Sequence, residues 1–253
     1  MSLALIAVAA AALLVPVTAP ASTVGAFDHT PWTTLLQRHV DDDGRVAYRD
    51  LAAKDAATLD AYLATIAAAD PAPWPRDEQL AFWLNAYNAC VFRAVLEGRT
   101  AESLPARFRM FMLDECDVAG RELTLYALEN DVVRPIGESR IHFALVCASA
   151  SCPKLMRRAW QADTLDADLD AAARGFVADP VRNVIREGAR AVHLSAIFDW
   201  YEDDFGGSSD AIRSYVARFA PEAAAMFLER DKPEVRFLDY DWTLNAQPGQ
   251  RPE

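Results

Sequence analysis

The sequence predicts a single α+β domain in which a central buried helix packs on a small, mainly antiparallel sheet with further helices around it. Three observations support this fold class. Segments with helical periodicity outnumber short strand-like segments, and the two kinds do not alternate regularly. The segment 77–97 is apolar on all sides, as expected of an enclosed helix. The 253 residues, with 12 Phe and 7 Tyr, are enough for one sizeable core.

The N-terminal part is predicted to be helical apart from one turn and one stiff connector. A first helix is expected over 28–40, where Pro31 suits the first helical position. The acidic run 41–44 ends in glycine and is typical of a turn. A second helix is expected over 51–69. Prolines between 70 and 75 then separate it from the central helix.

The segment Ile141–Cys147 (Ile-His-Phe-Ala-Leu-Val-Cys) is predicted to be the buried strand beside the central helix, because it is short and almost wholly apolar. The segment 121–128 is expected to begin as a strand and turn helical. The remaining expected elements are helices over 164–177, 210–219 and 221–230 and short strands over 45–48, 191–194 and 236–240.

The two ends of the chain are predicted to differ from the middle. Residues 1–21 combine an uncharged apolar run with the small-residue site Ala19-Pro20-Ala21, which is typical of a cleavable signal peptide. The apolar run is too short for a membrane anchor. We therefore expect an exported protein, periplasmic or secreted, with no stable membrane anchor after cleavage. A single globular domain is expected over 22–245 and a flexible tail over 246–253.

The formal net charge of −12, with no basic run longer than Arg157-Arg158, argues against nucleic acid as a partner. No phosphate loop, dinucleotide fingerprint or metalloprotease motif is present in the sequence, so no cofactor and no metal is predicted. The expected partner is a small molecule, a peptide or a protein.

Two asparagines mark the central helix. Asn85 and Asn88 lie one turn apart and share a face of a helix with little exposed surface. A buried amide needs hydrogen-bond partners. The pair is interpreted either as a structural clamp on a neighbouring loop or as groups that bind or orient a substrate.

The segment that follows residue 141 carries the candidate chemistry. A histidine in an apolar segment, His142, needs a partner for each ring nitrogen. Cys147 and Cys152 flank a turn of small residues that includes Ser149 and Ser151. Thiols beside loops are common nucleophiles. In one continuous strand His142 and Cys147 would face opposite sides, so a bulge or the use of Cys152 would be needed.

The four cysteines have a competing interpretation. An exported protein usually pairs its cysteines, and four allow three connectivities. The short-loop option joins Cys147 to Cys152 and is complemented by a disulfide between Cys90 and Cys116. A third and weaker option is a metal site with His142, Cys147 and Cys152 as ligands.

A third cluster interleaves aromatic residues with carboxylates over 198–205. Trp200 and Tyr201 are the candidates for lining a pocket, and Glu129 is a weaker single candidate. The alternative is a turn whose aromatics fill the core. His29 and His39 are expected at the surface.

These segments together resemble a bacterial and plant family called domain of unknown function 547, over roughly 28–245. The segments that carry the resemblance are Ala81–Asn88, Leu123–Leu125 with Glu129, Ile141–Pro153, Leu194–Tyr201 with Asp204-Phe205, and Tyr240–Trp242. The resemblance implies that Asn85, His142, Cys147 and Cys152 belong to a family motif. It implies no particular activity. Tyr126-Ala127-Leu128, just before Glu129, depart from the family pattern.

Two functions follow as hypotheses. The first is a thiol-dependent hydrolase or acyl transferase, with Cys147 or Cys152 as nucleophile, His142 as base and Asn85 as the orienting group. The second is a non-enzymatic extracytoplasmic binding or interaction domain stapled by a Cys147–Cys152 disulfide. Both hypotheses predict a cleft beside Cys147, walled by Trp200 and Tyr201, with Asn88, Ser149, Ser151 and Glu129 as candidate ligand-binding residues.

Overall fold

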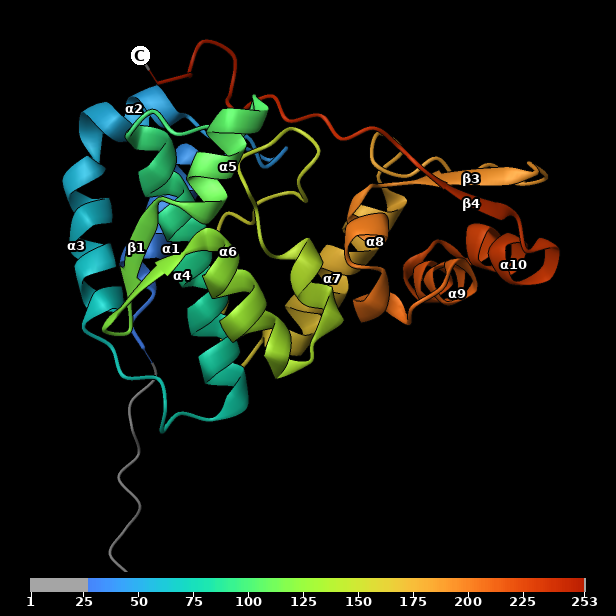
Figure 1. The fold of residues 1–253 in the computed structure, drawn as a ribbon, viewed down its shortest axis with the longest axis horizontal. Coiled ribbons are helices and arrows are strands. Elements are labelled where there is room, and N and C mark those ends of the chain that lie inside the picture. Colours follow the sequence, from blue (N-terminus) through green and yellow to red (C-terminus); the bar gives the residue numbers. More distant parts are fainter. Residues whose placement is uncertain (1–26, 253) are drawn as a thin grey trace, which may run out of the picture.

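The computed structural model describes residues 27–252, and the predicted signal peptide over 1–21 lies outside the described residues. The N-terminal half is a layer of helices around one buried helix (Figure 1). These helices are α1 (Thr30–His39), α2 (Tyr48–Lys54), α3 (Ala56–Ala67) and α4 (Arg76–Leu96). Fourteen consecutive or near-consecutive residues of α4, from Leu80 to Val95, are buried on all sides, which confirms the predicted central helix.

The expected helix over 51–69 is two helices, broken at Asp55. The Asp55 carboxylate accepts hydrogen bonds from the Arg38 guanidinium and from the His39 ring, each at 2.6 Å. This contact fixes Asp55 outside helical geometry. It also buries His39, and His29 is equally buried beneath Tyr62, so the expectation that both histidines lie at the surface is wrong. The acidic turn at 41–44 is confirmed, with the amide of Gly44 bonded to the Asp41 carbonyl.

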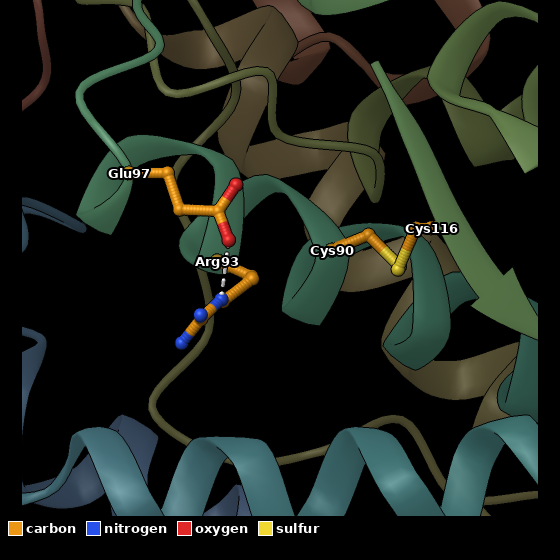
Figure 2. The surroundings of a disulfide bond; sticks show 4 residues. All are labelled: Cys90, Arg93, Glu97 and Cys116. Carbon is orange, nitrogen blue, oxygen red and sulfur yellow. Dashed lines mark hydrogen bonds and ion pairs between the residues drawn. A yellow bond between two sulfur atoms is a disulfide. The ribbon is translucent and has the colours of Figure 1, made fainter.

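Two short strands follow the helical layer after α5 (Leu104–Met112). They are β1 (Glu115–Val118) and β2 (Arg121–Thr124), an antiparallel pair with Cys116 opposite Leu123. A disulfide joins Cys116 of β1 to Cys90 of α4, as one of the open connectivities predicted (Figure 2). Arg93 follows Cys90 in α4 and pairs with Glu97, which directly follows the helix. After β2 the chain turns helical, as expected, through α6 (Leu125–Ala127), the π-helical η1 (Leu128–Val133) and η2 (Arg134–Ile136).

The strand predicted over Ile141–Cys147 is wrong. Its first part is a 3₁₀ helix, η3 (Ser139–Phe143), and the rest is irregular. The cause lies in α4. The Asn88 side-chain amide donates to the Ala144 carbonyl at 3.0 Å and accepts from the Val146 amide at 2.9 Å. These are backbone groups that a neighbouring strand would otherwise have to satisfy. The segment 141–146 is buried as predicted, but the Asn88 side chain, not a neighbouring strand, bonds its backbone groups.

The C-terminal half forms a second, smaller hydrophobic cluster. Its elements are α7 (Leu165–Ala178), β3 (Ala191–Leu194), α8 (Ile197–Trp200), η4 (Glu202–Phe205), α9 (Ser209–Phe219), α10 (Glu222–Asp231) and β4 (Glu234–Phe237). Strands β3 and β4 pair in parallel, with Val192 opposite Val235. Two separate two-stranded sheets thus replace the single sheet expected, while the α+β class is confirmed. In the described part of the chain, no helix is both long and apolar enough to span a membrane.

After β4 the chain runs back across the molecule to the side of α2 (Figure 1). On its way it pairs with the loop that follows η3, where the Ala150 amide donates to the Thr243 carbonyl at 2.7 Å. Further on, the Gln247 amide donates to the Val46 carbonyl and Arg251 pairs with Glu102. The segment expected to be a flexible tail therefore makes defined contacts up to residue 251.

Candidate active site

A pocket of about 400 Å³ opens where the two hydrophobic clusters meet. One wall comes from α4, η1 and the segment after η3, and the other from α8 and the C-terminal segment. The lining residues are Tyr87, Phe111, Tyr126, Glu129, Asn130, Arg134, His142, Leu145, Cys147, Cys152, Pro153, Ile197, Trp200, Tyr201, Tyr240 and Trp242. The pocket therefore combines two thiols, an imidazole and a carboxylate with an unusually aromatic surface.

The loop 147–152 places the two thiols together. Ala148, directly after Cys147, has the left-handed φ of 62° that L-residues rarely adopt. This turn is held from both sides. The Asn245 amide donates to the Ala148 carbonyl at 3.0 Å, and the Arg182 guanidinium donates to the Cys152 carbonyl at 2.6 Å. The strained conformation at Ala148 is thus maintained by contacts from distant parts of the chain.

Cys147 and Cys152 are free thiols whose sulfur atoms lie 2.7 Å apart. The disulfide expected between them is therefore not formed in this structure. Cys147 is partly exposed in the pocket, whereas Cys152 is buried. The Tyr240 hydroxyl lies 3.5 Å from the sulfur of Cys147 and donates to that of Cys152 at 3.2 Å.

The two thiols differ in acidity. Hydrogen bonding with Cys152, and then with Ser149 and Tyr240, lowers the pKa of Cys147 to about 7 despite burial. Burial raises the pKa of the Cys152 thiol, and the negative charge that develops on Cys147 adds to this effect. When a thiolate forms near neutral pH it therefore forms on Cys147, and Cys152 remains a proton donor.

His142 also lines the pocket and is held by Asp204 of η4. Its Nε2 lies 2.7 Å from Oδ2 of Asp204, and its ring stacks on Tyr201 with centroids 3.9 Å apart. Hydrogen bonds from His142 and then Arg134 hold the pKa of Asp204 far below its usual range. Because that carboxylate is ionised and can only accept, Nε2 must carry the proton, which leaves Nδ1 as the second functional atom of the ring.

Glu129 lies on the π-helical turn η1 and is 8% exposed. Its Oε2 accepts a hydrogen bond from the Tyr87 hydroxyl at 3.3 Å. Burial, and then the negative charge of Glu129, raise the pKa of Tyr201 well above its usual range. Both phenols are therefore un-ionised donors beside a carboxylate.

The mouth of the pocket is aromatic. Trp200, which is 47% exposed, lies 5.4 Å from Trp242 and 4.8 Å from Tyr240 between ring centroids. The guanidinium of Arg107 covers the Trp242 ring at 3.5 Å. These rings offer a flat apolar surface, which suits an apolar or planar part of a ligand.

The structure brings together six of the residues singled out in the sequence: Glu129, His142, Cys147, Cys152, Trp200 and Tyr201. The cleft walled by Trp200 and Tyr201 is present. Four other candidates lie outside the pocket lining. Asn85 bonds both backbone groups of Trp160 through its amide, and Asn88 bonds Ala144 and Val146. Ser149 is buried beside the Cys147 sulfur, and Ser151 accepts from the Asp241 amide.

Both asparagines therefore act as clamps on neighbouring segments. For the metal alternative, the side chains of the described residues 27–252 form no cluster of three His, Cys, Asp or Glu ligands. Nε2 of His142 is hydrogen-bonded to Asp204, and within the same part of the chain no hydrogen bond joins the ring to either sulfur.

Sequence reasoning missed four residues of the site: Arg134, Asp204, Tyr240 and Trp242. Asp204 lies inside the acidic and aromatic run at 198–205. The signal that could have identified it was His142, because a buried histidine needs a hydrogen-bond partner. Nothing local marked Tyr240 or Trp242 as pocket residues, because the C-terminal segment reaches the pocket only by crossing the molecule (Figure 1).

Fold and site thus define an α+β domain with a dithiol at the floor of an aromatic pocket. Residues 71–177 match the family described as "Protein of unknown function, DUF547", which confirms the resemblance seen in the sequence. The match includes α4, Glu129, His142 and both thiols, whereas Asp204 and the aromatic mouth lie beyond it. Neither a search of curated proteins nor a search of solved structures found a match.

Proposed function

We propose that this domain is a thiol-dependent hydrolase or acyl transferase with Cys147 as its nucleophile. The observation that carries the proposal is the partly exposed Cys147 thiol, with a pKa of about 7, in one pocket with the His142–Asp204 pair. A thiolate available near neutral pH is the reactive form in acyl transfer.

Cys147 and His142 have separate roles in the proposed reaction. Among the hydrogen bonds of the described residues, none joins His142 to either sulfur, so Cys152, Ser149 and Tyr240 stabilise the thiolate instead. The proposed reaction starts from the Cys147 thiolate and a His142 ring protonated on both nitrogens. The thiolate attacks the acyl carbon, and Nδ1 of His142 gives its proton to the leaving group. His142 then takes a proton from water or an acceptor, which attacks the thioester and releases the product. Asp204 holds the ring and stabilises its protonated form.

The walls of the pocket favour a small substrate or the end of a chain. A volume of about 400 Å³ is within the range of small-molecule sites. The acyl group would lie against Trp200 and Tyr240, with polar atoms toward Glu129 and Tyr87.

Acyl-enzyme trapping tests this proposal. The purified protein is mixed with p-nitrophenyl acetate, and released nitrophenol and intact mass are followed together. We expect a burst of one nitrophenol per chain and an acetyl group on the peptide that carries Cys147. The Cys147→Ser variant should lose the burst, and the matched variant Ser151→Ala, whose hydroxyl lies outside the pocket, should keep it. Acetylation spread over other residues in place of Cys147 would contradict the proposal.

We also infer that the mature chain works outside the cytoplasm, as its N-terminal segment predicts. The Cys90–Cys116 disulfide supports this, because disulfides form and persist in oxidising compartments. An alkaline phosphatase reporter fused after residue 30 should be active in a bacterial host. A reporter that stays inactive while the fusion accumulates in the cytoplasm would contradict the inference.

The second candidate function is a non-enzymatic binding domain with Cys147 and Cys152 as a staple. The 2.7 Å contact between the sulfurs favours it, because only a small movement separates this contact from a bond. Thiol counting under non-reducing denaturation distinguishes the two functions. Two free thiols per chain in the exported protein favour the enzyme, whereas a count of none that persists after equilibration with reduced glutathione favours the staple.

A further inference from the structure

We infer that Cys147 and Cys152 also form a redox-active dithiol that exchanges with disulfides of small thiols or of peptides that reach the pocket. This activity is separate from acyl transfer and needs neither His142 nor an acyl substrate. The geometry assigns different parts to the two residues. Cys147 is the sulfur that a substrate meets in the pocket, and Cys152 lies behind it, buried and in contact.

The first step is an attack by Cys147. Its thiolate attacks one sulfur of the substrate disulfide, the substrate S–S bond breaks, and the first substrate thiol leaves with the electron pair and takes a proton from solvent. A mixed disulfide between Cys147 and the other half of the substrate remains. The lowered pKa of Cys147 provides thiolate for this attack at neutral pH.

The second step is an attack by Cys152. Its sulfur lies 2.7 Å from that of Cys147, so it is placed to attack the mixed disulfide and release the second substrate thiol. Two donors already point at Cys152, the Cys147 backbone amide at 3.1 Å and the Tyr240 hydroxyl at 3.2 Å. When Cys147 no longer carries charge, these donors stabilise the Cys152 thiolate that must form. The substrate disulfide is reduced by two electrons, and the Cys147–Cys152 pair is oxidised to a disulfide.

The same chain provides an internal control. Cys90 and Cys116 already form a disulfide between α4 and β1 (Figure 2), away from the aromatic pocket. A reagent that reduces disulfides without selectivity would open both pairs. A redox-active site at Cys147 and Cys152 would instead change its oxidation state while Cys90–Cys116 stays bonded. Reduced glutathione would return the oxidised pair to the dithiol and close the cycle.

Redox titration with glutathione tests the inference. The purified full-length protein is equilibrated in a series of reduced and oxidised glutathione mixtures, free thiols are trapped with iodoacetamide after denaturation, and peptides are mapped by mass. We expect Cys147 and Cys152 to pass together from two alkylated thiols to one disulfide across the series, while Cys90–Cys116 stays oxidised. A pair that remains alkylated at every ratio, or remains oxidised at every ratio, would overturn the inference.

Single variants test the order of attack. With oxidised glutathione, Cys152→Ser should accumulate a glutathionyl group on Cys147, because the resolving sulfur is absent. Cys147→Ser should accumulate much less on Cys152, which is buried. The reverse pattern would contradict the assignment. Exchange without an acetyl burst would refute only the acyl transferase proposal, and a burst without exchange would refute only the redox inference.

Discussion

The Nε2 atom of His142 lies 2.7 Å from Oδ2 of Asp204, a carboxylate 62 positions later in the chain. The same carboxylate receives two hydrogen bonds from Arg134, at 2.8 and 3.0 Å. Asp204, in η4, therefore joins η2 and η3 to the C-terminal half. It fixes the ring of His142 in the lining of the pocket that also contains the thiols.

Replacing Asp204 by Asn should destabilise the protein in a pH-dependent way. An Asp with a lowered folded-state pKa stabilises the fold above its unfolded pKa of about 4, and this contribution is lost as the pH falls toward the folded pKa. We expect a loss of about 1–3 kcal/mol in the free energy of unfolding at pH 7, and a smaller loss at pH 3. Urea denaturation at both pH values measures it.

The neighbouring carboxylate serves as the control. The Asp203 side chain is exposed and makes no hydrogen bond among the described residues. Asp203→Asn should leave the stability at pH 7 nearly unchanged. An Asp204→Asn variant with the same deficit at pH 7 and pH 3 would show that the pairing with His142 and Arg134 is not its cause.

Replacing Asn85 and replacing Asn88 should have different effects on the reactivity of the Cys147 thiol. Asn85→Ala and Asn88→Ala each leave a backbone amide and a carbonyl without partners, which should cost about 2–4 kcal/mol in unfolding free energy. Only Asn88 holds the segment that leads to Cys147. Asn88→Ala should therefore shift the pH midpoint of Cys147 alkylation, and Asn85→Ala should not. Equal shifts in both variants would contradict the division.

Gly44 should tolerate a methyl group less well than Gly98. Both have a left-handed φ, 77° and 76°, but a Cβ on Gly44 would lie 2.7 Å from the Leu155 backbone nitrogen, and one on Gly98 would meet nothing within 4 Å. Gly98→Ala thus reports the cost of the conformation alone, about 1–2 kcal/mol, and Gly44→Ala should cost clearly more. Thermal unfolding of the two variants checks this, and equal costs would contradict it.

The helices were predictable from the sequence because their signal is local. The apolar faces of 77–97 and 164–177 predicted α4 and α7 within a few residues. The segment 141–147 was predicted wrongly as a strand, because a short apolar run indicates burial without indicating which groups satisfy its backbone. Here the Asn88 side chain satisfies the backbone groups of Ala144 and Val146, which lie 56 and 58 positions later in the chain.

The sequence indicated which kinds of reactive side chain form the site, but not which of them contact one another. An imidazole, two thiols and an aromatic pair stood out because such groups need partners when buried. The partner of His142 and the aromatic mouth depend on how the C-terminal half folds back, which periodicity does not encode. The sequence left both a disulfide and a reactive thiol open for Cys147 and Cys152. The 2.7 Å contact between their sulfurs is compatible with both states in turn.

The most direct test of Cys147 as the nucleophile is the pH dependence of its alkylation. The rate of iodoacetamide modification at Cys147, read by peptide mass, should rise with pH to a plateau with a midpoint at about 7, because hydrogen bonding with Cys152, Ser149 and Tyr240 lowers its pKa. Cys152 should react much more slowly over the same range. A midpoint at the ordinary thiol value of about 8.5, or faster modification of Cys152, would contradict the account.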